Sequence, residues 1–240
     1  TMGVGDYQTN LKSAAELLAK AKKPVFLSGA GLSAESGIPT FRDAGGLWAK
    51  YNPQDLATPE AFEADPEFVW SWYNDRKELI LKAEPNAGHK AAASLQNQLN
   101  MPLITQNVDG LQHKAGANEV WEMHGNVFEV RCVNCGVQSE WYGLETNRPV
   151  CESCQEGLLR PNVVWFGESL DHNVLGKIFA ALDGADVLIV AGTSGAVYPA
   201  GGLSVEVRRQ GGRIIEVNVD PPAKAFQNDI VLKEKTGRAL

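Results

Sequence analysis

Four short apolar runs, each ending at small or polar residues, recur along the chain. The first spans Val25 to Leu27, and the others lie within "MPLITQNVDG" (101–110), "ADVLIVAGTSG" (185–195) and "GRIIEVNVD" (212–220). Continuous apolar runs separated by helical segments are typical of parallel strands with helices on both faces. The pattern therefore predicts an α/β fold with a Rossmann-like, doubly wound parallel sheet.

Two stretches have the apolar spacing of helices. The segment 10–23 begins at Asn10, which we expect to be the N-cap, and it ends in a basic last turn. Residues 66–83 begin at Pro66 and place Phe68, Val69 and Trp72 at helical spacing. Both helices are expected to bury one apolar face.

Two other stretches, 36–83 and 127–160, fit the sheet poorly. The first is aromatic and proline-punctuated without an apolar strand run, and the second holds all 4 cysteines. We expect them to form a smaller second domain. Residues 1–35, 84–126 and 161–240 are then the Rossmann-like domain.

Polar or glycine-rich clusters follow each predicted strand, at residues 29–33, 106–109, 192–194 and 218–220. In a doubly wound sheet, ligands bind beyond the carboxyl ends of the strands. The sequence therefore predicts one ligand site built from these four clusters.

The composition narrows the class of protein. With 240 residues, 44% of them hydrophobic and 21% charged, the chain can bury a sizeable core. The net charge of -7 argues against a general nucleic-acid binder. We find no apolar run long enough for a bilayer and no secretory signal core, so we expect a cytoplasmic protein without a membrane partner. A mitochondrial location after removal of a transit peptide stays open.

The segment from Gly29 to Ala34 fits the pattern G-x-G-x-x-A directly after a predicted strand. In that pattern the glycines let the backbone approach a pyrophosphate. No second strand ending in an acidic residue follows about 20 residues on, as dehydrogenases require. The loop "ESGIPTFRDAGGLW" follows instead, in which Phe41 could stack on a ring and Arg42 could take up negative charge. We expect a dinucleotide without hydride transfer; an ordinary long loop is the alternative.

Cys132-x-x-Cys135 and Cys151-x-x-Cys154 are separated by the spacing of a zinc ribbon. Four thiolates would form a closed tetrahedral site, which is structural and not catalytic. Disulfide pairing is the alternative, and an intracellular location argues against it.

His124 in "EVWEMHGNVFEV" lies at the boundary between the sheet and the cysteine-bearing segment. An imidazole there could serve as a general base near neutral pH, and a purely structural histidine is the alternative. We interpret His89 as a helix-start residue and His172 as a cap or surface residue.

Tyr73 and Arg76 share a helix face because they are three residues apart. A phenol beside a planar guanidinium suits a carboxylate bound in bidentate fashion. The alternative is a surface arginine that lies over an aromatic ring and pairs with an acidic side chain.

Together these segments resemble the sirtuins, the NAD-dependent protein-lysine deacylases, over essentially the whole chain. The motifs "GAGLSAESGIPTFR", "TQNVDGL", "MHGN", the paired C-x-x-C, "VVWFGE", "GTSG" and "VNVD" stand in the family's order. "TFR", "DLATPEAF" and Tyr-x-x-Arg at 73–76 resemble the branch that removes succinyl, malonyl and glutaryl groups. One departure is Gln112, where most relatives have histidine; His113 is displaced by one position.

The resemblance implies NAD as a consumed co-substrate, one structural zinc ion, and acylated-lysine proteins or peptides as substrate. It implies catalysis by His124 and Asn107 and zinc ligation by Cys132, Cys135, Cys151 and Cys154. The implied substrate residues are Tyr73, Arg76, Val164, Trp165, Phe166 and Gly167, with strand addition of the peptide along 163–168. The implied NAD residues are Gly29, Ala30, Gly31, Ser33, Glu35, Thr40, Phe41, Arg42, Gln106, Asn107, Val108, Asp109, Gly192, Thr193, Ser194, Asn218, Val219 and Thr236.

In the implied reaction the acyl amide oxygen attacks the ribose as nicotinamide leaves. His124 accepts a proton from the ribose hydroxyls, and lysine is released with 2'-O-acyl-ADP-ribose. Acetyl groups are expected to be weaker substrates, because a neutral acetyl group leaves the Arg76 pocket unused. An ordinary deacetylase, an NAD-sensing zinc-ribbon module without turnover, and ADP-ribosyl transfer are the alternatives.

Overall fold

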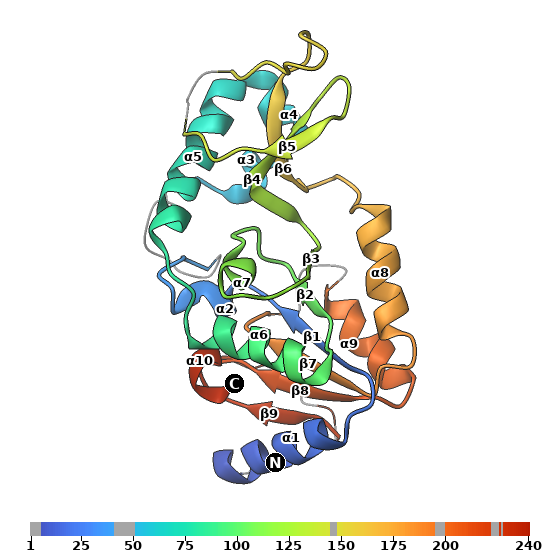
Figure 1. Cartoon of the computed structure of the whole chain (residues 1–240). Helices are drawn as coiled ribbons and strands as arrows, with labels where there is room; N and C mark the ends of the chain where they lie inside the picture. The colour runs from blue at the N-terminus through green and yellow to red at the C-terminus, as the bar shows by residue number, and fades with distance from the viewer. Residues whose placement is uncertain (1–5, 41–50, 145–147, 195–199, 222–225, 227) are drawn as a thin grey trace.

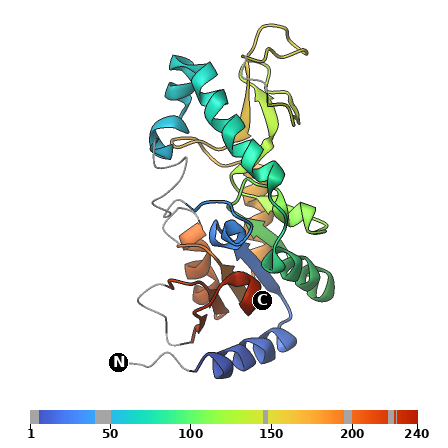
Figure 2. The same ribbon diagram turned by 90° about the vertical axis from the view of Figure 1, so that its left-hand side faces the viewer.

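The computed structural model describes residues 6–40, 51–144, 148–194, 200–221, 226 and 228–240. Two lobes follow one another along the long axis of the molecule, and each is built around its own sheet (Figure 1). Seen at right angles, the α1 helix lies at the far end of the larger lobe (Figure 2). No helix among these described residues combines the length and apolar character needed to cross a bilayer.

The larger lobe contains a six-stranded sheet in the order β3-β2-β1-β7-β8-β9. Its strands are β1 (Pro24–Ser28), β2 (Leu103–Thr105), β3 (Val120–Glu122), β7 (Val187–Ala191), β8 (Arg213–Val217) and β9 (Ile230–Leu232). All neighbouring pairs are parallel. The chain moves outward from β1 to β3, returns to β7 beside β1, and then continues in the other direction. The predicted doubly wound sheet is therefore confirmed, with its switch point between β1 and β7.

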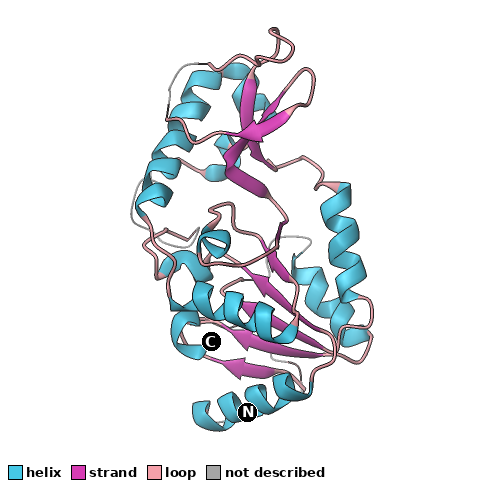
Figure 3. Cartoon of the chain, in the orientation of Figure 1, coloured by secondary structure: helices cyan, strands magenta, loops and turns pink. Residues whose placement is uncertain are grey.

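Helices cover both faces of this sheet (Figure 3). Phe26 points to the face covered by α1 (Tyr7–Lys20), α6 (Ala87–Leu99) and α10 (Thr236–Ala239). Leu27 points to the face covered by α8 (His172–Leu182) and α9 (Ala200–Arg209). Since side chains alternate along a strand, burial on both faces requires the continuous apolar runs seen in the sequence.

The smaller lobe holds a three-stranded antiparallel sheet in the order β5-β4-β6. Its strands are β4 (Gly125–Cys132), β5 (Gln138–Glu140) and β6 (Leu159–Val163), and its helices are α3 (Pro53–Leu56), α4 (Pro59–Ala64) and α5 (Pro66–Lys82). The predicted helix at 66–83 is confirmed as α5, with Asp65 as its N-cap. The Trp70 Nε1–H group donates to the Leu159 carbonyl over 3.0 Å, which joins α5 to β6.

The structure differs from the sequence expectations at the start of α1, at the edge strands of the large sheet and at one domain boundary. Helix α1 begins at Tyr7 with Asp6 as its N-cap, so Asn10 is not the cap; its amide donates to the Val231 carbonyl on β9. The edge strands β3 and β9 were not predicted from the sequence. The domain boundaries stay a proposal, and β6 crosses the one placed after residue 160.

Candidate functional site

Two glycine-containing loops meet at the switch point of the large sheet. The Gly31 N–H group donates to the Gly192 carbonyl over 2.7 Å. A Cβ on Gly29 would lie 2.6 Å from Thr193 Cβ, and a Cβ on Gly31 would lie 2.7 Å from Gly192 Cα. Packing of the two loops against each other therefore requires these glycines, in addition to any need for space beside a pyrophosphate. The short helix α2 (Gly31–Ala34) follows at once.

The predicted clusters meet at these loops. Asn107 Nδ2 donates to the Gly29 carbonyl over 2.9 Å, and Gln106 Nε2 donates to Thr193 Oγ1 over 2.8 Å. Asn218 Nδ2 donates to the Thr193 carbonyl over 2.9 Å. Hydrogen bonds thus connect the carboxyl ends of β1, β2, β7 and β8 into one polar site, as the sequence predicted.

A buried hydrogen-bond chain runs from His89 to Asp109. The Asn86 N–H group donates to His89 Nδ1 over 3.1 Å, so the neutral ring carries its proton on Nε2. That Nε2 lies 3.1 Å from Ser33 Oγ, and Ser33 Oγ donates to Asp109 Oδ2 over 2.6 Å. Burial lowers the pKa of His89, against the opposing influence of Asp109 and then Glu35. The chain fixes the buried Asp109 carboxylate against Ser33 of α2.

His124 lies in the two-residue link between β3 of the large sheet and β4 of the small one. Its Nδ1 is 3.1 Å from the Gln106 carbonyl, which can only accept, so Nδ1 carries the proton. A neutral ring of this tautomer has its lone pair on Nε2. Burial lowers the pKa of His124, while the bond to Gln106 opposes this shift. The imidazole is therefore a neutral proton acceptor at pH 7.

The other residues that the sequence analysis assigned to NAD binding are spread more widely over the structure. Val108 packs against the core of the small lobe, and Val219 is exposed. Glu35 accepts from the Thr236 hydroxyl over 3.3 Å and from the Gly237 N–H group over 2.8 Å, which attaches α10 to α2. Described residues in loops or turns around the site include Ala30, Thr40 and Ser194. Phe41 and Arg42 lie outside the described residues.

A buried carboxyl group lies two residues before Asn218. Glu216 on β8 is 9% exposed, and its Oε1 is enclosed without a hydrogen-bond partner. Burial raises the pKa of Glu216 to about 7, while Asn218 and Arg208 oppose the shift and Asp229 adds to it. Sequence reasoning did not single out this residue, because it lies within an apolar strand run.

Tyr73 and Arg76 lie on α5, and Tyr73 faces the segment after β6. Tyr73 is fully buried and its hydroxyl accepts from Trp165 Nε1–H over 2.8 Å. The Arg76 Cζ lies 4.9 Å from the Trp72 ring centroid and 5.5 Å from that of Tyr73. Burial lowers the pKa of Arg76, while the neighbouring Tyr73 and Asp109 oppose this shift. The expected pairing of a phenol and a guanidinium is present.

The predicted substrate segment follows β6. The Val164 N–H group donates to the His124 carbonyl over 2.8 Å, which places this segment beside the proposed base. Trp165 is buried, whereas Phe166 and Gly167 are exposed. The described backbone of 164–168 is not in a strand, so peptide binding by strand addition stays a prediction.

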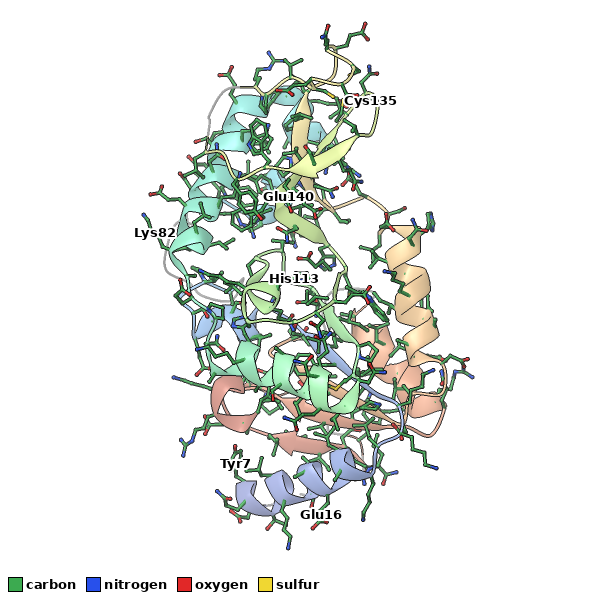
Figure 4. All side chains as sticks on the ribbon, in the orientation of Figure 1. Tyr7, Glu16, Lys82, His113, Cys135 and Glu140 are labelled. Atoms are coloured by element: carbon green, nitrogen blue, oxygen red, sulfur yellow. The ribbon has the colours of Figure 1, made fainter. Side chains whose placement is uncertain are left out.

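The four cysteine sulfurs lie within 4.8 Å of one another at the far end of the small lobe, where Figure 4 labels Cys135. Cys132 Sγ lies 3.6 Å from Cys154 Sγ, and Cys135 Sγ lies 3.8 Å from Cys151 Sγ. A tetrahedral zinc ion with four sulfurs at about 2.3 Å requires sulfur separations of about 3.8 Å. The donor set fits one zinc ion with no open coordination position, so the site is structural.

Backbone N–H groups support this zinc site. The N–H groups of Asn134 and Cys135 donate to Cys132 Sγ over 3.3 and 3.4 Å, and that of Gly157 donates to Cys154 Sγ over 3.4 Å. Those of Glu156 and Gly157 lower the pKa of Cys154 to about 6. The thiolate form of Cys154 is thereby favoured, as zinc ligation requires.

Comparisons with known proteins agree with this arrangement. A model described as the Sir2 family matches residues 29–199. The chain is 46% identical over 239 residues to an NAD-dependent protein deacylase of Thermococcus kodakarensis, covering 96% of this chain and 93% of that protein. It is 49% identical over 219 residues to one of Aquifex aeolicus, covering 90% and 91%. A solved Sir2 homologue–NAD complex matches with a TM-score of 0.88 and 44% identity, covering 95% of this chain and 90% of that one.

Proposed function

The chain belongs to the Sir2 (sirtuin) family of NAD-dependent enzymes, and on that premise we propose that it removes acidic acyl groups from protein lysines. Succinyl and malonyl groups, with glutaryl as a further substrate, are transferred to ADP-ribose with the uptake of one water molecule, and nicotinamide and free lysine are released. Acetyl is the weaker substrate. The fold, the polar site at the switch point and the zinc ligands support the general deacylase activity; the acyl preference rests on α5.

The observation that carries the preference is the placement of Arg76 and Tyr73. The Tyr73 hydroxyl accepts from Trp165, so its own proton is directed elsewhere and is available to a bound carboxylate. The Arg76 guanidinium lies against the rings of Trp72 and Tyr73, in surroundings where burial disfavours its charge. A substrate carboxylate would offset that penalty, whereas an acetyl methyl group would not.

The remaining chemistry is proposed for residues of the polar site. NAD would supply the ribose, whose 2'-hydroxyl oxygen receives the acyl group. His124 is suited to accept a ribose hydroxyl proton at Nε2, because its Nδ1 is engaged by the Gln106 carbonyl. Asn107 and Gln106 are held against the loops after β1 and β7, where they can orient the nicotinamide riboside.

The test compares kcat/KM for matched succinyl-lysine and acetyl-lysine peptides in the intact protein and in Arg76→Met. A charge-assisted contact is worth about 1.5 to 3 kcal/mol, so about ten- to a hundredfold of succinyl preference should disappear in the variant. Lys82→Met is the matched control, because Lys82 is an exposed cation on the same helix, with a side chain 72% exposed (Figure 4). It should retain the preference.

Other outcomes would separate the alternatives. A preference for acetyl in the intact protein would make it an ordinary deacetylase, and Arg76 would then serve packing alone. NAD binding without turnover of either peptide would favour a sensor and refute the enzyme assignment.

A further inference from the structure

An ion pair between a buried arginine and a partly buried glutamate closes the segment that contains Trp165. Arg160, on β6, is 5% exposed, and its NH1 and NH2 groups donate to the two carboxylate oxygens of Glu168 over 2.5 and 3.0 Å. The Arg160 NH2 group also donates to the Val163 carbonyl over 2.9 Å. Residues 160 and 168 are thereby joined across the intervening chain. We call this pair the clasp.

The clasp holds Trp165 by its backbone and by its ring. The Trp165 N–H group donates to Glu168 Oε2 over 2.9 Å, and the Arg160 Cζ lies 3.3 Å from the Trp165 ring centroid. Phe62 packs against the same ring at a centroid distance of 5.4 Å. The indole N–H group donates to Tyr73, so the clasp is connected through Trp165 to the proposed acyl receptor.

Stability alone is a poor explanation for such a pair. The buried Arg160 charge and the partly buried Glu168 charge both lose hydration, and apolar residues of the same volume often stabilise a protein equally well. A bidentate guanidinium, however, restricts geometry in a way that an apolar contact does not. Its partner Glu168 also accepts a hydrogen bond from the backbone N–H group of Trp165, whose ring Arg160 contacts. The arrangement therefore favours a role in orientation.

We infer that Arg160 and Glu168 are positioning residues for the acyl-lysine substrate, acting through Trp165 and Tyr73. The clasp fixes the buried indole, while Phe166 and Gly167 remain exposed on the same segment for contact with the peptide. Loss of the clasp frees the indole and removes the donor that orients the Tyr73 hydroxyl. This inference rests on the proposed deacylase function and identifies which residues set its substrate site.

Arg131 offers a matched control. Its NH2 group also donates to Glu168 over 3.0 Å, but its side chain is 37% exposed. The ring contact with Trp165 belongs to Arg160. A role limited to neutralising Glu168 would make the two arginines equivalent, whereas a positioning role would not.

The experiment measures kcat and the KM values for an acyl-lysine peptide and for NAD in Arg160→Met, Arg160→Lys and Arg131→Met. Arg160→Met should lower kcat/KM for the peptide about ten- to a hundredfold, with the KM for NAD changed less than about threefold. Arg160→Lys should not restore activity, because lysine lacks the planar fork. Arg131→Met should stay within about threefold of the intact protein.

Folding is checked by zinc content and circular dichroism. Should Arg160→Met fail to fold, Glu168→Gln takes its place, since its amide oxygen can still accept from the Trp165 N–H group, while the charge and one of the two acceptor oxygens are lost. It should lower peptide kcat/KM about three- to tenfold with the KM for NAD unchanged. The inference, but not the proposed function, would be overturned by unchanged peptide kinetics in the folded variant. Equal losses of kcat/KM for the peptide and for NAD would also overturn it. Absence of all turnover in the intact protein would instead overturn the proposed function, and the inference with it.

Discussion

Replacement of Glu216 by glutamine should make the protein more resistant to unfolding at alkaline pH. Burial raises the pKa of this carboxyl from its ordinary 4.5 to about 7. The folded state therefore disfavours the carboxylate. The cost is absent well below pH 4.5, grows as the pH rises, and is complete above pH 7. At about 1.36 kcal/mol for each pH unit between the two values, it amounts to about 3 kcal/mol.

The glutamine variant cannot ionise, so it should lack this pH-dependent loss. Its amide nitrogen would occupy a position where Glu216 Oε1 has no partner, and an unpaired buried donor costs about 1 to 3 kcal/mol at every pH. The informative quantity is therefore the difference in free energy of unfolding between the variant and the intact protein, and how this difference changes from pH 5 to pH 8. We expect the variant to gain about 2 to 3 kcal/mol over that range.

Urea denaturation followed by tryptophan fluorescence at both pH values measures this difference. Glu216→Asp is the control, because it keeps a carboxyl at the same strand position and should keep the same sign of pH dependence. If the free energy of unfolding of Glu216→Gln differed from that of the intact protein by the same amount at pH 5 and at pH 8, the reasoning would be refuted. The carboxyl would then titrate in the folded state as it does in the unfolded chain.

Three further outcomes are expected. His124→Ala should lower turnover by at least about a hundredfold while NAD binding is retained. In the intact protein, kcat/KM should fall with decreasing pH only below about 6.5, because burial lowers the pKa of His124. A fall in kcat/KM centred above pH 7 would contradict this. Metal analysis should find one zinc ion per chain, and Cys151→Ser should release it and unfold the small lobe; full retention of zinc would count against the site. Gly31→Ala should destabilise the protein by about 2 kcal/mol, measured by urea denaturation, because the new Cβ would lie 2.7 Å from Gly192 Cα; unchanged stability would show that the loops can separate.

Much of the architecture was readable from the sequence because strong local signals agree with it. The central strands are buried on both faces, which produces the long apolar runs, and Pro66 is at the first turn of α5 as expected. The cysteine spacing identified the zinc ligands because four sulfurs must converge on one point. The weak signals were those of short edge strands such as β9 (Ile230–Leu232), whose pairing is decided by the whole sheet.

The site was predictable in its location and less so in its connections. His89 is at the start of α6 as expected, yet its ring also reaches Ser33, which lies 56 residues earlier. The pairing of Arg160 with Glu168 depends on how the backbone turns after β6. No local pattern specifies such partners, since each depends on tertiary packing. The glycines of the switch point were noticed correctly, but their contact with each other could only be found in the fold.

The strand order has a consequence for how the chain assembles. Strand β1 pairs with β7, so Leu27 must find Val190 across more than half of the sequence, and until then β1 has only β2 as a neighbour. The strands of the small sheet all come from residues 125–163 and can associate earlier. Because distant pairings form slowly, the large sheet should keep an open edge until residue 191 has emerged from the ribosome. Completion of the cofactor site is therefore a late event in the life of the nascent chain.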